Sequence, residues 1–216
     1  MLKASLSLAV VALVGVVLLA GTWELTEDQI AEQRRKAVLA SLNQILPADQ
    51  YDNDIQDDIL ILNAQGFFHH PKPITVFRAR RQGQPVALIM QMTSPDGYNG
   101  DIGLLVGIDT AGKIVGVRVT RHRETPGLGD SIDTRRSDWI LGFNSHSLGN
   151  PATKLWTVKR NGGYFDQFTG ATISPRAVVK AVRRALEYER DHRTELYQPK
   201  VQADQAKQPV KEGTEK

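Results

Sequence analysis

Two threonines, a glycine and an aspartate lie close together in a ten-residue stretch that could bind a phosphorylated ligand. Residues 166–175 read DQFTGATISP. Ser174 followed by Pro175 predicts the start of a helix, with Ser174 as the N-cap and Pro175 at the first helical position. Such a helix end presents unpaired N–H groups and partial positive charge, which bind anions. Because Gly170 and Ala171 are small, we predict that a phosphate can lie against the backbone beside Thr172.

A second stretch, residues 120–130 (TRHRETPGLGD), could contact a flat ligand. Gly127 and Gly129 flank Leu128, so the backbone there can adopt positive φ angles and approach a ligand closely. His122 and Glu124 supply polar groups at the end of a predicted strand. The alternative interpretation is a tight polar loop without a ligand. A metal site is not predicted, because His122 and Glu124 have no third ligand at a suitable spacing.

The sequence also excludes several common kinds of nucleotide-binding, catalytic and metal site. Nucleotide-binding motifs of the types GxxxxGK[ST] and GxGxxG, and the GxSxG motif of serine hydrolases, are absent. The chain has no cysteine, which excludes disulfides, cysteine-bound zinc, iron–sulfur clusters and CxxCH haem attachment. Any redox cofactor must therefore be held by groups other than sulfur. The net charge of +3 is too small to indicate nucleic-acid binding.

The two stretches must be positioned by strands and helices that the rest of the sequence predicts. Residues 75–80, 86–92, 102–108 and 114–119 are predicted to form two hairpins, and residues 155–158 are strand-like. Residues 59–62 are a further short apolar run. Helical spacing of apolar residues predicts one helix over residues 24–46, ended by Pro47, and another from Ser174 onward. This order predicts an α+β fold with antiparallel strands and flanking helices.

The N-terminal segment is predicted to be a membrane anchor. The 20 residues from Ala4 to Trp23 are uncharged, and as a helix they would span about 30 Å. A cleaved signal peptide is the alternative, but cleavage after Ala20 would place Leu18 where a small residue is preferred. Lys3 before the run and acidic residues after it favour a cytoplasmic N-terminus. The predicted regions are a transmembrane anchor (1–23), one extracytoplasmic domain (24–198) and a disordered polar tail (199–216).

Several segments resemble the periplasmic FMN-binding domain family. The resemblance covers residues 97–109 and 112–117, His122, and the sequence ETPGLG at 124–129. Residues 166–174 are similar to the family's flavinylation motif, D-x-x-[ST]-G-A-T-x-[ST], without departure from it. With the single N-terminal span, the chain from Met1 to about Arg193 resembles the RnfG (RsxG) family of the Rnf (Rsx) electron transport complex.

This resemblance implies a covalent cofactor. FMN would be joined by a phosphoester bond to Thr172, the last threonine of the motif, by a flavin transferase that uses FAD and reads Asp166. The residues expected around the cofactor are Asp166, Thr169, Gly170, Ala171, Thr172 and Ser174 in the motif, and His122, Glu124, Thr125, Gly127, Leu128 and Gly129 in the other stretch. Candidates for stacking on the flavin ring are Tyr98, Trp139, Trp156 and Phe168, with core packing favoured for the two tryptophans.

The resemblance also implies a location and partners. The protein would be a single-pass inner-membrane protein with its domain on the periplasmic side, bound to the other subunits of the complex. It would act as an electron-carrying redox subunit of an ion-translocating oxidoreductase, with no catalytic residue of its own. One alternative is the related flavin-bearing subunit of the sodium-translocating NADH:quinone reductase, which shares the motif but is typically longer. Another is an anchored assembly subunit without a cofactor, for which a degenerate motif would be expected.

Overall fold

A computed structural model describes residues 32–198, together with residues 12, 13, 15, 16, 18, 26, 29 and 30. The chain divides into two compact units, the first ending at Ser41 and the second beginning at Leu42. In the first unit, residues 32–41 are helical. Within the described residues, no helix combines the length and apolar character needed to span a bilayer. Most of the predicted anchor (1–23) and all of the predicted tail (199–216) lie outside the described residues.

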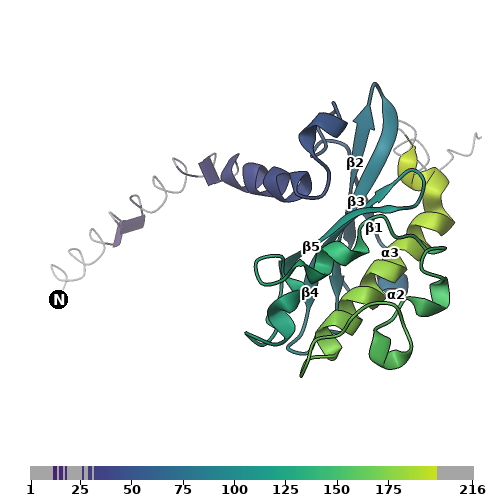
Figure 1. Ribbon diagram of the computed structural model, residues 1–216. Coiled ribbons are helices and arrows are strands. Elements are labelled where there is room, and N and C mark those ends of the chain that lie inside the picture. The colour runs from purple at the N-terminus through teal and green to yellow at the C-terminus, as the bar shows by residue number, and fades with distance from the viewer. Residues whose placement is uncertain are drawn as a thin grey trace, which may run out of the picture. The chain divides into compact units, whose positions relative to one another are not determined.

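The second unit is built on a five-stranded antiparallel sheet (Figure 1). Its strands are β1 (Ile59–Leu62), β2 (Ile74–Arg81), β3 (Gln84–Ser94), β4 (Ile102–Asp109) and β5 (Ile114–Arg121), and they lie side by side in chain order. The four long strands confirm both predicted hairpins. The short apolar run at residues 59–62 adds β1, an edge strand that pairs with β2.

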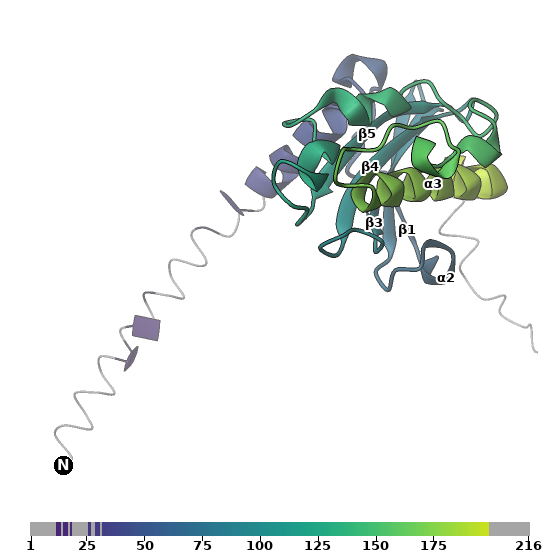
Figure 2. The same ribbon diagram turned by 60° about the horizontal axis from the view of Figure 1, so that its bottom comes forward.

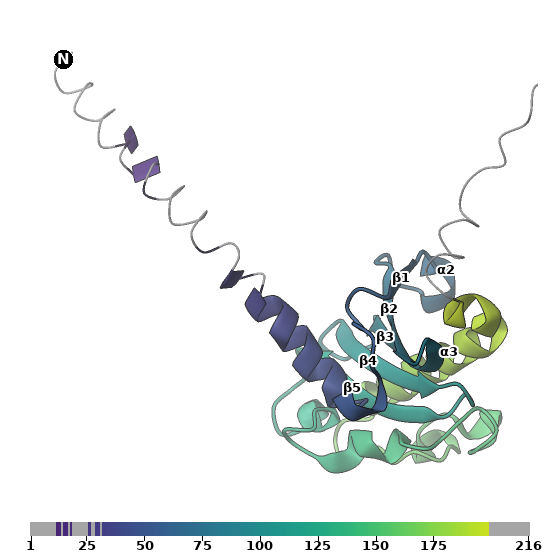
Figure 3. The same cartoon turned by 90° about the horizontal axis from the view of Figure 1, so that it is seen from above.

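One long helix covers one face of this sheet. It is α3 (Ile173–Tyr197), which crosses the strands and is flanked by the irregular segment 122–172 (Figures 1 and 2). Val178, Val182 and Leu186, spaced by four residues, are buried against the sheet, as expected for an amphipathic helix. The shorter helices are η1 (Ala48–Gln50), α2 (Gln65–Phe68), η2 (Gly129–Ile132), η3 (Asp138–Phe143), η4 (Thr153–Leu155) and η5 (Lys159–Asn161). Of these, α2 lies beside α3 (Figure 3), where its Phe rings contact Tyr188.

Residues from both faces of the sheet are buried, which explains why β4 reads as an almost continuous apolar run. On the face away from α3, Ile45 packs over Gly107 and Gly116, which are partners in neighbouring strands. A Cβ atom added to Gly107 would overlap Cγ2 of Ile45. The paired glycines therefore let the chain before β1 pack closely on the sheet.

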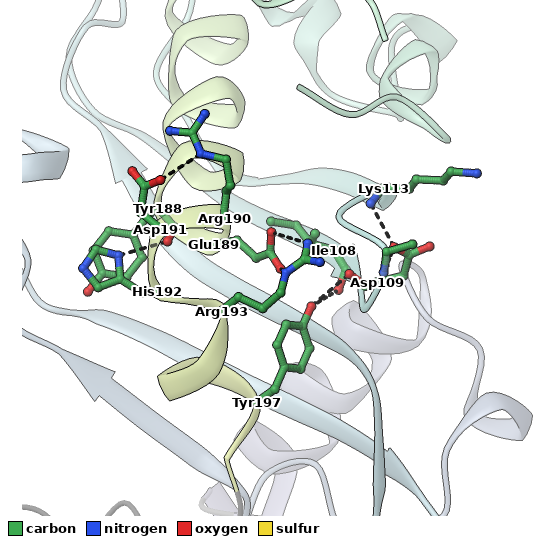
Figure 4. Close-up of polar contacts among 11 residues, drawn as sticks. Ile108, Asp109, Lys113, Tyr188, Glu189, Arg190, Asp191, His192, Arg193 and Tyr197 are labelled. Carbon is green, nitrogen blue, oxygen red and sulfur yellow. Dashed lines mark hydrogen bonds and ion pairs between the residues drawn. The ribbon is translucent and has the colours of Figure 1, made fainter. Parts of the chain in front are cut away.

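Polar contacts fix the C-terminal end of α3 to the sheet. The Tyr197 hydroxyl donates to the carbonyl of Asp109, the last residue of β4, at 2.9 Å (Figure 4). Arg78 and Arg80 of β2 are buried, and their guanidinium groups donate to the carbonyl of Gln198 at 2.8 and 2.7 Å. Cations at this position match the partial negative charge of a helix C-terminus. The last turn of α3 is therefore tied to two separate parts of the sheet.

We expect Tyr197→Phe to lower stability and to change its dependence on alkaline pH. Burial, together with the charge of Glu189, raises the pKa of Tyr197 far above its ordinary value. The unfolded phenol ionises near pH 10, so the free energy of unfolding falls as the pH rises above about 10. Tyr197→Phe should lose about 1 kcal/mol at pH 7, the value of one hydrogen bond, and show a shallower fall above pH 10. Urea unfolding between pH 7 and pH 11 measures both effects; parallel curves for the two proteins would contradict the expectation.

The strand prediction for residues 155–158 is wrong. Residues Thr153–Leu155 form η4, and Val158 makes only an isolated bridge with Phe165. Trp156 is buried there, and its indole N–H donates to the carbonyl of Pro151 at 3.1 Å. A buried aromatic residue in an irregular segment produces the same short apolar run as a strand, so periodicity alone does not separate them.

Candidate functional site

A cavity of about 300 Å³ lies at the N-terminal end of α3, between the loop after β3 and the loop after β5. Its lining residues are Tyr98, Glu124, Thr125, Leu128, Gly129, Gly170, Ala171, Thr172, Ile173 and Ser174. The cavity is at the small end of the range for ligand pockets. Three exposed apolar side chains stand on its wall: Tyr98, Leu128 and Ile173. Both stretches selected from the sequence, although distant along the chain, therefore contribute to one cavity.

Glu124 connects the walls of this cavity. The residue is 4% exposed, and its carboxylate accepts a hydrogen bond from the hydroxyl of Ser174, at the start of α3. It also accepts from the backbone N–H groups of Tyr98 and Asn99, at 3.4 and 3.3 Å. Gly129 lies against this pair, since a Cβ atom there would be 2.5 Å from Ser174 Oγ. One buried carboxylate thus joins the loop after β3, the loop after β5 and the first turn of α3.

Thr172 is held in place by a tight turn and by the helix that follows it. The backbone N–H of Ala171 donates to the carbonyl of Phe168 at 3.1 Å, and Gly170 has a φ of 80° in this turn. Positive φ favours glycine, because a side chain would clash with the backbone. Thr172 is the N-cap residue of α3 and its side chain makes no capping bond. Thr172 therefore lines the cavity at the positive end of a 25-residue helix, with its hydroxyl free of any capping bond.

The predicted helix start is wrong by two residues. The helix begins at Ile173, so Thr172, rather than Ser174, is the N-cap residue, and Pro175 is the third helical residue. Proline is tolerated there because the first four N–H groups of a helix have no partner within it. The hydroxyl of Ser174 instead donates to Glu124. A long-range contact has taken the serine away from the local capping role that its sequence position indicates.

Asp166 and Thr169 belong to the motif but do not line the cavity. Both are exposed, and Asp166 forms an ion pair of 2.7 Å with Lys159. The backbone carbonyl of Asp166 accepts a hydrogen bond from the indole of Trp139 at 2.9 Å. The motif therefore has two parts: one faces the cavity, and the other presents its side chains to the outside of the fold.

His122 and Gly127 also lie outside the cavity lining. The ring of His122 accepts a hydrogen bond from the backbone N–H of Glu124 through Nδ1, at 3.2 Å, and its Nε2 lies 3.6 Å from buried Asp133. Hydrogen bonds from Arg135 lower the pKa of Asp133, against the opposing effect of burial, and the charge of His122 lowers it further. His122 thus positions the loop that carries Glu124, while its ring points to Asp133.

Arg160 is a site residue that the sequence patterns did not identify. It lies in η5, and its guanidinium Nη1 donates to Thr172 Oγ1 at 3.3 Å. The two residues are twelve positions apart in an irregular part of the chain, so no helix or strand periodicity links them. The only signal is a basic pair, Lys159 and Arg160, ahead of two glycines. Ile173 was also missed, because its place on the cavity wall follows from where α3 begins.

Comparison with known families identifies a flavin-binding class of protein, and the match covers the whole cavity. Residues 97–187, which include every cavity-lining residue, match the FMN-binding domain family. Residues 1–45 match the family described as the RnfG N-terminal region. The FMN-binding domain inferred from the sequence is therefore confirmed.

Curated relatives specify the family further. The chain is 46% identical over 195 residues to the G subunit of the ion-translocating oxidoreductase complex of Vibrio cholerae serotype O1, covering 90% of this chain and 93% of the relative. It is 46% identical over 203 residues to the protein of the same description from Pseudomonas aeruginosa, covering 94% and 95%. The chain belongs to this RnfG family of ion-translocating oxidoreductase complexes. Of the two families considered from the sequence, the comparisons support RnfG rather than the NADH:quinone reductase relative.

Proposed function

We propose that this protein is the FMN-carrying subunit of an ion-translocating oxidoreductase complex, with FMN esterified through its phosphate to Thr172 Oγ1. The observation that carries the proposal is the placement of Thr172. It lies on a cavity wall, at the positive end of α3, with a hydroxyl that makes no capping bond. The relatives named as subunits of such a complex support the assignment of partners.

The residues of the cavity suit this cofactor. When bound, FMN supplies one- and two-electron redox chemistry, and the chain has no thiol that could carry an electron pair instead. The helix N-terminus and Thr172 suit a phosphate group, which keeps one negative charge as a diester. Tyr98 and Leu128 offer apolar surface for a flat ring. Glu124 holds the loop that carries Tyr98 and thereby sets the shape of the wall that faces this ring.

Attachment would be a phosphoryl transfer from FAD to Thr172. Thr172 Oγ1 forms a bond to the FMN phosphorus of FAD, the pyrophosphate bond breaks, AMP leaves and the threonine proton passes to the transferase or to water. The protein must present the motif to a separate flavin transferase for this reaction. Asp166 and Thr169 are exposed, and Asp166 is 68% exposed at its side chain, which supports a role in recognition by that enzyme.

The attachment is tested by labelling the full chain in the presence and absence of a flavin transferase and FAD. We expect a fluorescent band under ultraviolet light after denaturing electrophoresis only when the transferase is present. A dark band with active transferase would contradict the proposed linkage and would favour an assembly subunit without a cofactor. A colourless protein purified from cells that make the transferase would also contradict the linkage and favour an assembly subunit without a cofactor.

We also propose the location predicted from the sequence: an anchor in residues 1–23, a periplasmic domain in residues 24–198 and a polar tail in residues 199–216. The uncharged run from Ala4 to Trp23 supports the anchor, and Lys3 before it supports the orientation. Protease added to intact spheroplasts should digest the domain, while a cytoplasmic marker protein survives. Protection of the domain until the membrane is opened would contradict this orientation.

A further inference from the structure

Two neighbouring cations face the two ends of the motif. Lys159 pairs with Asp166 at 2.7 Å, and Arg160 donates from Nη1 to Thr172 Oγ1 at 3.3 Å. The side chain of Arg160 therefore lies at the oxygen atom that would carry the ester, on the segment before the motif. Since Arg160 does not line the cavity, its guanidinium approaches Thr172 from outside the cavity wall.

The position of Arg160 is fixed by backbone contacts of a closed turn. The N–H of Lys159 donates to the carbonyl of Phe165 at 2.7 Å, and that of Gly163 donates to the carbonyl of Val158 at 3.1 Å. A Cβ atom on Gly163 would overlap the carbonyl oxygen of Thr157, so the two sides of the turn are in close contact. Arg160 is at the tip of this turn.

The turn is also joined directly to the motif. The backbone N–H of Arg160 donates to Oε1 of Gln167 at 3.1 Å. Gln167 is the residue after Asp166, so the same stretch that carries Thr172 also holds the backbone of Arg160. Because these contacts are made by the backbone, replacing the Arg160 side chain leaves them in place.

We propose that Arg160 binds the phosphodiester formed at Thr172, an inference that rests on the proposed attachment of FMN. Esterification turns Oγ1 into a bridging oxygen, which is a weak acceptor, and places on the attached phosphorus two oxygens that share a negative charge. A guanidinium already at Oγ1 can move its donors to these oxygens and form a charge-assisted pair. The helix N-terminus neutralises the same charge from the other side.

The same contact aids the transfer reaction. Negative charge accumulates on the phosphoryl oxygens as the bond to Thr172 Oγ1 forms and the bond to AMP breaks. Arg160 stabilises this charge from the acceptor protein, in addition to whatever the transferase supplies. Arg160→Gln should therefore slow flavin incorporation by about tenfold, the effect expected for the loss of one charge-assisted contact.

The experiment compares the full-length wild type with Arg160→Gln, Arg160→Lys and Arg81→Gln. Arg81 is an exposed arginine at the end of β2, next to Arg80, which contacts the other end of α3. Initial rates of incorporation from FAD are measured by in-gel fluorescence, and the loaded proteins are compared by the ³¹P chemical shift of the diester. We expect a slower rate and a changed shift for Arg160→Gln, partial recovery for Arg160→Lys, and wild-type values for Arg81→Gln.

The ³¹P shift and the incorporation rate together decide between binding of the diester by Arg160 and its other possible roles. A changed ³¹P shift in Arg160→Gln together with a slower rate supports both the binding of the diester and the aid to transfer. A changed shift with an unchanged rate supports the binding of the diester and overturns the aid to transfer. An unchanged shift overturns it even when the rate falls, because Arg160 would then act in recognition by the transferase. Equal changes in Arg81→Gln also overturn it, because net charge would explain the effect. If the wild type takes up no flavin, the attachment at Thr172 fails, and with it the basis of the inference.

Discussion

Thr172→Ala should abolish covalent flavin incorporation altogether. The substitution removes the oxygen atom that forms the ester, and no partial contact can replace a covalent bond. We expect the denatured band to be dark after reaction with the flavin transferase and FAD, and the mass of the chain to be unchanged. Stability should change little, because the Thr172 side chain makes no capping bond to α3.

Two further variants make this result specific to the Thr172 hydroxyl. Thr172→Ser keeps an oxygen at the same position and should be labelled, although more slowly. Thr194→Ala removes an exposed threonine near the other end of α3 and should be labelled like the wild type. A fluorescent Thr172→Ala band would show that the flavin is attached elsewhere. Fluorescence lost equally in Thr194→Ala would indicate a general defect in α3.

Glu124→Ala should produce the largest loss of stability among cavity substitutions. It leaves the N–H groups of Tyr98 and Asn99 and the hydroxyl of Ser174 without their acceptor. Hydrogen bonds to a buried charged group are worth more than neutral ones, and the buried hydroxyl of Ser174 would be left unpaired at a further cost. We expect the free energy of unfolding to fall by about 2–4 kcal/mol, measured by urea denaturation of protein prepared without transferase.

The matched control is another glutamate of the same domain. Glu187 pairs with Arg183 at 2.7 Å on the surface of α3, and Glu187→Ala should cost no more than about 0.5 kcal/mol. Glu124→Gln keeps the shape of the side chain without its charge and should fall between the two. An effect of Glu124→Ala as small as that of Glu187→Ala would show that Glu124 does not connect the walls of the cavity.

The strands and the long helix could be predicted because their signals are local. Alternation along residues 75–80 and 114–119, with glycine turns between the strands, depends on neighbours within a few positions. The spacing of apolar residues after Ser174 likewise predicts α3. The two hairpins account for the pairings of β2 with β3 and of β4 with β5, whereas the pairings of β1 with β2 and of β3 with β4 were found in the structure.

The details of the cavity could not be predicted, because they depend on contacts between distant positions. Ser174 has the sequence context of an N-cap, but Glu124, fifty residues away, takes its hydroxyl. Arg160 reaches Thr172 across an irregular segment in which no periodicity applies. His122 lies in the right stretch, yet its ring faces Asp133 because the loop turns between His122 and Glu124.

The small size of the cavity and its exposed apolar wall affect how a flavin can be kept bound there. A flavin held there only by noncovalent contacts would dissociate whenever its free concentration fell below its dissociation constant. Under the proposed linkage, occupancy no longer depends on that concentration. The walls formed by Tyr98, Leu128 and Ile173 then need to orient the ring without enclosing it. A cavity of about 300 Å³ can thus stay open on one side, where a partner protein can approach the cofactor directly.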